Sequence, residues 1–140
     1  MELNAIRQVA VPWAGACGLT TGLMLTALHQ DVWNGNLVLS MGIPTDIDSP
    51  PQVSYQLVFE HLYGYRVLEG ADVLEQVDDD EWDIDSQIQL ITPSRFLTWF
   101  HQETHGAHLD EDIQHYRISS WDFCVDVLSA QPPEIDLKQE

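Results

Sequence analysis

The stretch VSYQLVFEHLYGYRV, residues 53–67, contains two runs in which every second residue is large and apolar. A period of two is typical of a β-strand, because successive side chains point to opposite faces of the sheet. Each run therefore predicts a strand with one buried face. The apolar positions are Val53, Tyr55, Leu57 and Phe59 in the first run, and Tyr63, Tyr65 and Val67 in the second.

The same alternation recurs elsewhere in the chain. Residues 82–90 and 121–127 alternate in this way, with mostly Asp and Gln between their apolar residues. Residues 23–28 and 36–41 resemble two further strands around turn material at 31–35. A helix ending at Gly35 is the alternative there, so residues 19–30 stay open between strand and helix. Together the runs predict a mainly antiparallel sheet of about six strands.

One principal helix is expected near residues 93–105. Thr92 can cap its N-terminus, Pro93 suits the first helical position, and Gly106 can end it. An apolar stripe at positions i, i+3 and i+4 would face the sheet. The stripe consists of Phe96, Trp99 and Phe100. Several strands with a single helix between them predict the α+β class.

The chain has the length of a single domain. With 140 residues it can bury a substantial core, and we place the α+β domain at residues 1–130. The segment 131–140 begins with two prolines and continues with mixed charges, so we expect it to be loosely held. Residues 8–30 carry no Asp, Glu, Lys or Arg, but Pro and Gly interrupt the apolar run, which is unfavourable for a transmembrane helix.

The two cysteines indicate the cellular compartment. Cys17 and Cys124 lie far apart and form no paired spacing, which favours free thiols in a reducing cytoplasm. Cys124 also alternates with Asp122 and Asp126, and anionic neighbours raise the pKa of a thiol. Cys124 is therefore a poor candidate for a nucleophile.

Charge is the most informative property of the composition. The chain has 23 Asp and Glu against five Lys and Arg, a formal net charge of −18. Nucleic acids and anionic membranes need a basic footprint, so both are excluded as partners. A field of this sign favours a basic protein partner, because it accelerates the encounter with cationic surfaces.

The acids concentrate in two segments that we predict to bind the partner. The first patch contains Asp78, Asp79, Asp80, Glu81, Asp83 and Asp85, and the second contains Asp110, Glu111 and Asp112. Neither Asp78 nor Asp79 begins a calcium-binding EF-hand loop, because Gly and Glu are missing from the sixth and twelfth positions. A solvated acidic loop or a contact surface for a basic protein are the two interpretations.

Three histidines offer a metal site as an alternative. His101 and His105 are one helical turn apart, and His108 follows in the expected loop. The segment does not match the H-E-x-x-H motif of zinc proteases, and histidines at a solvated helix C-terminus explain the same residues. No motif in the sequence requires a cofactor, so none is expected.

Four segments carry a resemblance to a class of known proteins. Segments 54–60, 65–70, 115–118 and 125–128 resemble the strands of short, acidic, single-domain bacterial proteins, some of which are immunity proteins of toxin systems. The resemblance implies a stoichiometric inhibitor that binds a toxin, with no catalytic residues to transfer. Many such toxins are basic nucleases, whose phosphate-binding clefts Asp and Glu can fill.

The leading hypothesis is thus a non-enzymatic, cytoplasmic binding protein of the immunity type that docks on a basic protein such as a nuclease. Two alternatives stay open. One is a metal-dependent enzyme that uses the His101 and His105 cluster. The other is a homo-oligomeric structural protein, whose acidity keeps it in solution and whose copies associate through a strand edge.

Overall fold

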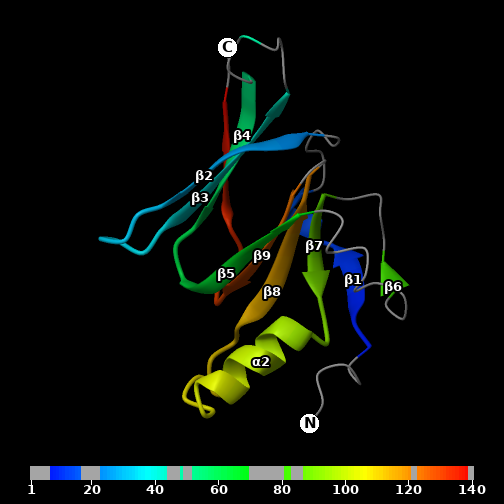
Figure 1. The fold of residues 1–140 in the computed structure, drawn as a ribbon, viewed down its shortest axis with the longest axis vertical. Helices are drawn as coiled ribbons and strands as arrows, with labels where there is room; N and C mark the ends of the chain where they lie inside the picture. The colour runs from blue at the N-terminus through cyan, green and yellow to red at the C-terminus, as the bar shows by residue number, and fades with distance from the viewer. Residues whose placement is uncertain are drawn as a thin grey trace.

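The computed structural model describes residues 7–16, 23–43, 48, 52–69, 81–82, 87–120 and 123–138. These residues form two β-sheets and one α-helix, as Figure 1 shows, with a short 3-10 turn at Ala14–Ala16. No helix in these ranges is both long enough and apolar enough to cross a membrane.

The smaller sheet is an antiparallel arrangement of four strands in the order β10-β4-β3-β2. Its strands are β2 (Met24–Gln30), β3 (Leu37–Ile43), β4 (Gln52–Phe59) and β10 (Glu134–Leu137). The strand alternative for the segment before Gly35 is therefore confirmed for residues 24–30, whereas residues 19–22 lie outside the described residues. β10 belongs to the segment expected to be loosely held, and it pairs with β4 along its whole length.

The larger sheet has six strands in the order β5-β9-β8-β7-β1-β6, with only the β1–β6 pair parallel. Its strands are β1 (Val9–Pro12), β5 (Leu62–Glu69), β6 (Glu81–Trp82), β7 (Ile88–Ile91), β8 (Gln114–Ser119) and β9 (Phe123–Ser129). The alternating run 82–90 contributes to two strands, β6 and β7, and β1 lies between them. β5 pairs with β9 across a sequence separation of about sixty residues, as in the pair Arg66–Asp126.

The larger sheet forms the middle layer of the molecule. One of its faces packs on the four-stranded sheet, and the helix lies against its other face (Figure 1). Because side chains alternate along β9, Val125 and Val127 join the core between the sheets while Leu128 contacts the helix. β8 and β9 are consequently buried on both faces over most of their length. The fully buried residues of the core between the sheets include Leu37, Leu39, Met41, Leu57, Phe59 and Val127.

The helix, α2, spans Arg95–Glu103, close to the expected range. Its N-cap is Ser94 and not Thr92, so the predicted cap and the predicted first position at Pro93 were wrong. The reason is that the Ser94 side chain accepts the hydrogen bond from the third residue of the helix, which is the role of an N-cap. The helix ends three residues before Gly106, which has a positive φ of 75°.

The apolar stripe of α2 is only partly buried. Phe96 is buried and packs with Ile113 and Leu128 against the middle sheet, and Phe100 joins the same cluster. Trp99, the third residue of the stripe, is 45% exposed and stacks on Phe96. The stripe therefore anchors the helix through two of its three residues.

The α+β class and the predominance of antiparallel pairing are confirmed. The arrangement differs from the expectation of about six strands mainly in one sheet, because the described residues form sheets of six and four strands. The alternating run 82–90 forms two short strands, β6 and β7, and not one. β1 and β10 have only four residues each and give no periodic signal.

Candidate functional site

The structure locates one of the two predicted acidic patches. Asp110, Glu111 and Asp112 lie in the connection between α2 and β8, and all three are exposed. In the other patch, residues 78–80, 83 and 85 lie outside the described residues, and only the backbone of Glu81 is described, as the first residue of β6.

Glu111 is not an independent surface charge. Its carboxylate shares hydrogen bonds with Tyr63 of β5 and with His108, whose Nδ1 lies 2.9 Å from Glu111 Oε2. The hydrogen bond with Tyr63, followed by that with His108, lowers the pKa of Glu111 below its ordinary value. This residue therefore fixes the loop to β5 and stays ionised, while Asp110 and Asp112 are its neighbours in the patch.

The three candidate metal ligands contact different neighbours. The ring of His108 stacks on Phe100, with centroids 5.5 Å apart, whereas His101 lies in the last turn of the helix with its ring tilted against the same phenyl group. His105 follows the helix in a left-handed conformation with φ 52°. Within the described parts of the chain, no group of three or more His, Cys, Asp or Glu side chains is placed to hold a metal ion.

A different group of polar side chains lies inside the protein. Asp126 of β9 is fully buried, and its neighbours across the two adjacent strands are Arg66 of β5 and Arg117 of β8. Arg66 Nε donates to Asp126 Oδ2 over 2.8 Å, and Arg117 Nε donates to Asp126 Oδ1 over 2.7 Å. His115 Nε2 also lies 2.7 Å from Asp126 Oδ1. One carboxylate therefore receives hydrogen bonds from three side chains, and we call these four residues the Asp126 cluster.

The cluster is continuous with the helix cap. Ser94 Oγ lies 2.7 Å from His115 Nδ1 and also accepts a hydrogen bond from the backbone N–H of Leu97. Burial lowers the pKa of His115, although the Asp126 carboxylate opposes this, so the imidazole is neutral at pH 7. The Nε2–H then donates to Asp126 and Nδ1 accepts from the Ser94 hydroxyl, so both ring nitrogens of His115 have a partner.

The packing of α2 covers the cluster. The Phe96 ring lies edge-on to His115, with centroids 5.6 Å apart, and the Arg66 guanidinium lies 4.4 Å from the centre of the same ring. The guanidinium thus makes a cation–π contact on one side and an ion pair with Asp126 on the other. Phe96 separates the buried charges from water and holds the helix in place above them.

The chain from Ser94 to His115 to Asp126 contains the residue types of a hydrolase triad, but its geometry does not suit acyl transfer. Ser94 is buried, and its hydroxyl is occupied by both the helix N–H and the imidazole. A nucleophile must be able to contact its substrate. The arrangement therefore joins the helix to the sheet instead of activating a hydroxyl for attack.

The Asp126 carboxylate is ionised in the folded protein. Burial alone would raise the pKa of Asp126, but hydrogen bonds from His115 and Arg117 and the nearby positive charge outweigh it and hold the pKa well below its usual range. By linkage, the stability that this group contributes is present above the pKa of an unfolded Asp, about 3.9, and is lost as the pH falls below that value.

Cys124 is two residues from Asp126 on the same face of β9. Burial, which is the largest cause, raises the pKa of Cys124 to about 12, and the Asp126 charge contributes in the same direction. The expectation of a raised pKa is confirmed, although burial outweighs the charge of Asp126. Asp122, the other neighbour on which the expectation rested, lies outside the described residues. Cys17 lies outside the described residues.

Stability between pH 7.5 and pH 5 should depend on His115. Because its folded pKa is below that of an unfolded His, about 6.5, unfolding takes up a proton as the pH falls below 6.5. Uptake of this proton lowers the free energy of unfolding by at most about 1.4 kcal/mol for each unit by which the pH falls. The variant His115→Gln should lack that contribution and show a flatter profile in urea unfolding at a series of pH values. Equal slopes for the two proteins would mean that folding leaves the pKa of His115 unchanged.

No protein-family model, curated protein or solved structure matches this chain. The resemblance to bacterial immunity proteins accordingly rests on the strand segments 54–60, 65–70, 115–118 and 125–128 alone.

Proposed function

We propose that this protein is a cytoplasmic, non-enzymatic binding protein whose acidic surface docks on a basic protein, in the manner of an immunity-type inhibitor of a nuclease toxin. The observation that carries the proposal is the one-sided charge of the chain outside the Asp126 cluster. The cluster contains one of the 23 acids and two of the five Lys and Arg, which leaves 22 acids and three bases elsewhere.

The position of the two arginines strengthens this charge argument. Arg117 is buried, the Arg66 side chain is 35% exposed, and both guanidiniums are bonded to Asp126, so both positive charges are already paired with a carboxylate of the protein. Of the three remaining bases, Lys138 is paired with Asp136 over 2.7 Å. The partner therefore meets a surface whose charge is more negative than the net value of −18 indicates, and it must itself be cationic.

The exposed acids are available for such a contact. In the described residues they lie in connections, at strand ends and at the end of α2, where side chains reach solvent. They include Glu60, Glu69, Glu103, Asp110, Asp112 and Glu134. Carboxylates in these positions steer a basic partner from a distance and then pair with its Lys and Arg at the rim of the interface.

Recovery of the partner tests the proposal. The protein is immobilised and incubated with lysate of its native cell at low salt, then washed at high salt, and the eluted proteins are identified by mass spectrometry. We expect one basic protein, which after purification binds with 1:1 stoichiometry and with an association rate that falls as salt rises. Absence of any salt-sensitive stoichiometric partner would contradict the proposal.

Matched charge variants distinguish the two acidic patches. The first is Asp78→Asn with Asp79→Asn, and the second is Asp110→Asn with Asp112→Asn, so each removes two negative charges. Glu111 is left unchanged because Tyr63 and His108 share its carboxylate. The patch that faces the partner should lose about tenfold in association rate at low salt, measured by surface plasmon resonance, because steering by a local field accelerates encounter by tenfold or more. Equal rates for both variants and the wild type would remove both patches from the interface.

A further inference from the structure

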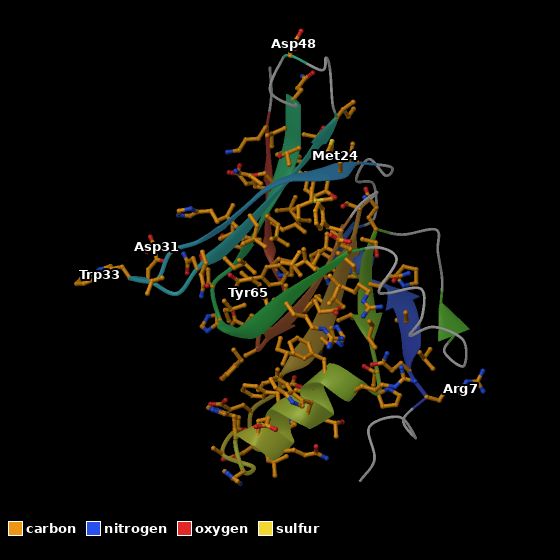
Figure 2. All side chains as sticks on the ribbon, in the orientation of Figure 1. Arg7, Met24, Asp31, Trp33, Asp48 and Tyr65 are labelled. Carbon is orange, nitrogen blue, oxygen red and sulfur yellow. The ribbon has the colours of Figure 1, made fainter. Side chains whose placement is uncertain are left out.

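The hairpin of β2 and β3 carries the most exposed large apolar side chains of the described residues. Val32 is 89% exposed and Trp33 is 97% exposed, both in the turn between the strands. Figure 2 shows the Trp33 side chain at the outermost point of the hairpin, directed away from the rest of the molecule. A Trp side chain in this position makes no contribution to the core and leaves a large apolar area in water.

The turn that presents Trp33 is fixed by hydrogen bonds. Asp31 Oδ1 accepts from the backbone N–H of Trp33 over 2.9 Å, and the Asp31 carbonyl accepts from Gly35 N–H over 2.7 Å. Asn34 Oδ1 accepts from the N–H of Asn36, also over 2.9 Å. Gly35 has a positive φ of 78°, a conformation that glycine adopts without strain. The backbone is therefore ordered, while the indole itself contacts only solvent.

The stem of the hairpin is attached to the other sheet. Tyr65 Oη of β5 lies 3.0 Å from Gln30 Oε1, at the last residue of β2 before the turn. Because this bond and the β2–β3 ladder both hold the stem, the tip keeps its position relative to the body of the protein. An anchor that is ordered before binding loses little conformational entropy in the complex, which increases affinity.

The carboxylates nearest the tip lie in the turn itself and at the strand ends beside it. Asp31 belongs to the turn, and strand register places Glu60 beside the end of the hairpin, because Leu37 pairs with Phe59. Glu134 begins β10 opposite Val58, at the same end of the sheet. The sequence has no Lys or Arg between positions 7 and 66, so none lies on β2, β3 or β4, and His29 is the one imidazole on these strands.

From these observations we infer that Val32 and Trp33 insert into an apolar pocket, bordered by Lys and Arg, on the basic partner. The inference rests on the proposed function and names the part of the surface that makes the central contact. Exposed Trp is the residue type that most often dominates a protein interface, provided that the contact around it excludes water. A second copy of this chain is not the occupant, because its own hairpin end would bring like charges together.

Substitution of Trp33 separates the anchor from the electrostatic contact. Trp33→Ala should weaken binding to the purified partner by about 30-fold or more, through faster dissociation at an unchanged association rate. Neutralising the acids should instead slow association. The matched control is Trp99→Ala, which removes an exposed Trp from α2 and should alter affinity by less than about threefold. The melting temperature of Trp33→Ala should stay that of the wild type, because the indole packs against nothing.

A crosslinking experiment identifies what the tip contacts. The photoreactive residue p-benzoylphenylalanine is incorporated at position 33, or at position 99 as control, in the full chain inside its native cell. A crosslink from position 33 to a basic protein, at a site flanked by Lys or Arg, supports the inference. A crosslink between two copies of this chain overturns it in favour of self-association. If Trp33→Ala dissociates at the wild-type rate, the inference fails while salt-dependent binding stands. If no salt-sensitive partner exists, the proposed function fails and the inference fails with it.

Discussion

Replacement of Asp126 by Asn is expected to lower the free energy of unfolding by about 3–5 kcal/mol. The amide keeps the shape of the carboxylate but removes the negative charge that Arg66 and Arg117 share inside the protein. The buried Arg117 guanidinium, and the Arg66 guanidinium at the edge of the cluster, would then lack their common counter-ion. Since a domain has only about 5–15 kcal/mol of net stability, the variant should be close to unfolding at 37 °C.

Urea unfolding of Asp126→Asn and of Asp136→Asn gives a matched comparison. Asp136 also pairs with a base, Lys138, at 2.7 Å, but both side chains of that pair are substantially exposed. Loss of a surface pair should cost less than about 1 kcal/mol. A similar small cost at Asp126 would show that the cluster is dispensable for stability and that water or a neighbouring group can replace the carboxylate.

Replacement of Gly42 by Ala should destabilise the protein by about 2–3 kcal/mol. Gly42 is buried in β3, at a register shift against β4, and an added Cβ would overlap with the backbone carbonyl of Gln52. It would also lie 3.0 Å from the Cα of Val53. Backbone atoms of a paired strand cannot rotate away as a side chain can, so β3 and β4 would have to separate locally.

Gly64→Ala is the control for this substitution. Gly64 lies in β5, and a Cβ built there meets no atom within 4 Å. With space available and no positive φ, Ala should leave stability unchanged or raise it by up to about 1 kcal/mol, because it restricts the unfolded chain. Both variants can be compared by urea unfolding, and equal stabilities would mean that β3 and β4 are farther apart at Gly42 than the structure shows.

The strands were more predictable than their pairing. Alternation at residues 53–59 and 63–67 corresponds to β4 and β5, because a buried face requires an apolar residue at every second position. The same pattern contains no information on which strand lies alongside. β5 belongs to one sheet and β4 to the other, although only two residues, Glu60 and His61, separate them. Local periodicity also gives no indication that β1 separates β6 from β7.

The Asp126 cluster was missed for a related reason. In an alternating strand the polar positions are ordinarily expected to face solvent, and Asp126 and Arg66 occupy such positions. The helix covers that face of the middle sheet, so both sides of β9 are buried. The sequence did contain one sign of the cluster. Of only five Lys and Arg in the chain, Arg66 and Arg117 lie within apolar strand runs, where a base needs a buried partner. Their common partner becomes evident only from the register of β5, β9 and β8.

The hairpin tip was only half predictable. The segment 31–35 predicts a turn from its Asp, Asn and Gly, and the structure confirms strands on either side of it. Its Val and Trp have no periodic partner, so the sequence does not distinguish an exposed indole from a buried one. Trp33 is exposed because the turn projects away from the rest of the protein (Figure 2). That projection depends on the tertiary fold and not on the local sequence.

The pairing of the strands also determines the order in which the two sheets can form while the chain is being synthesised. β2, β3 and β4 follow one another and can pair as soon as they leave the ribosome, whereas β5 has its partner only in β9 and β4 acquires its second neighbour only in β10. Both sheets are thus completed by the last two strands of the chain. Until then the nascent protein exposes the apolar edge of β5, and its long-range contacts make folding slow compared with a protein of local contacts.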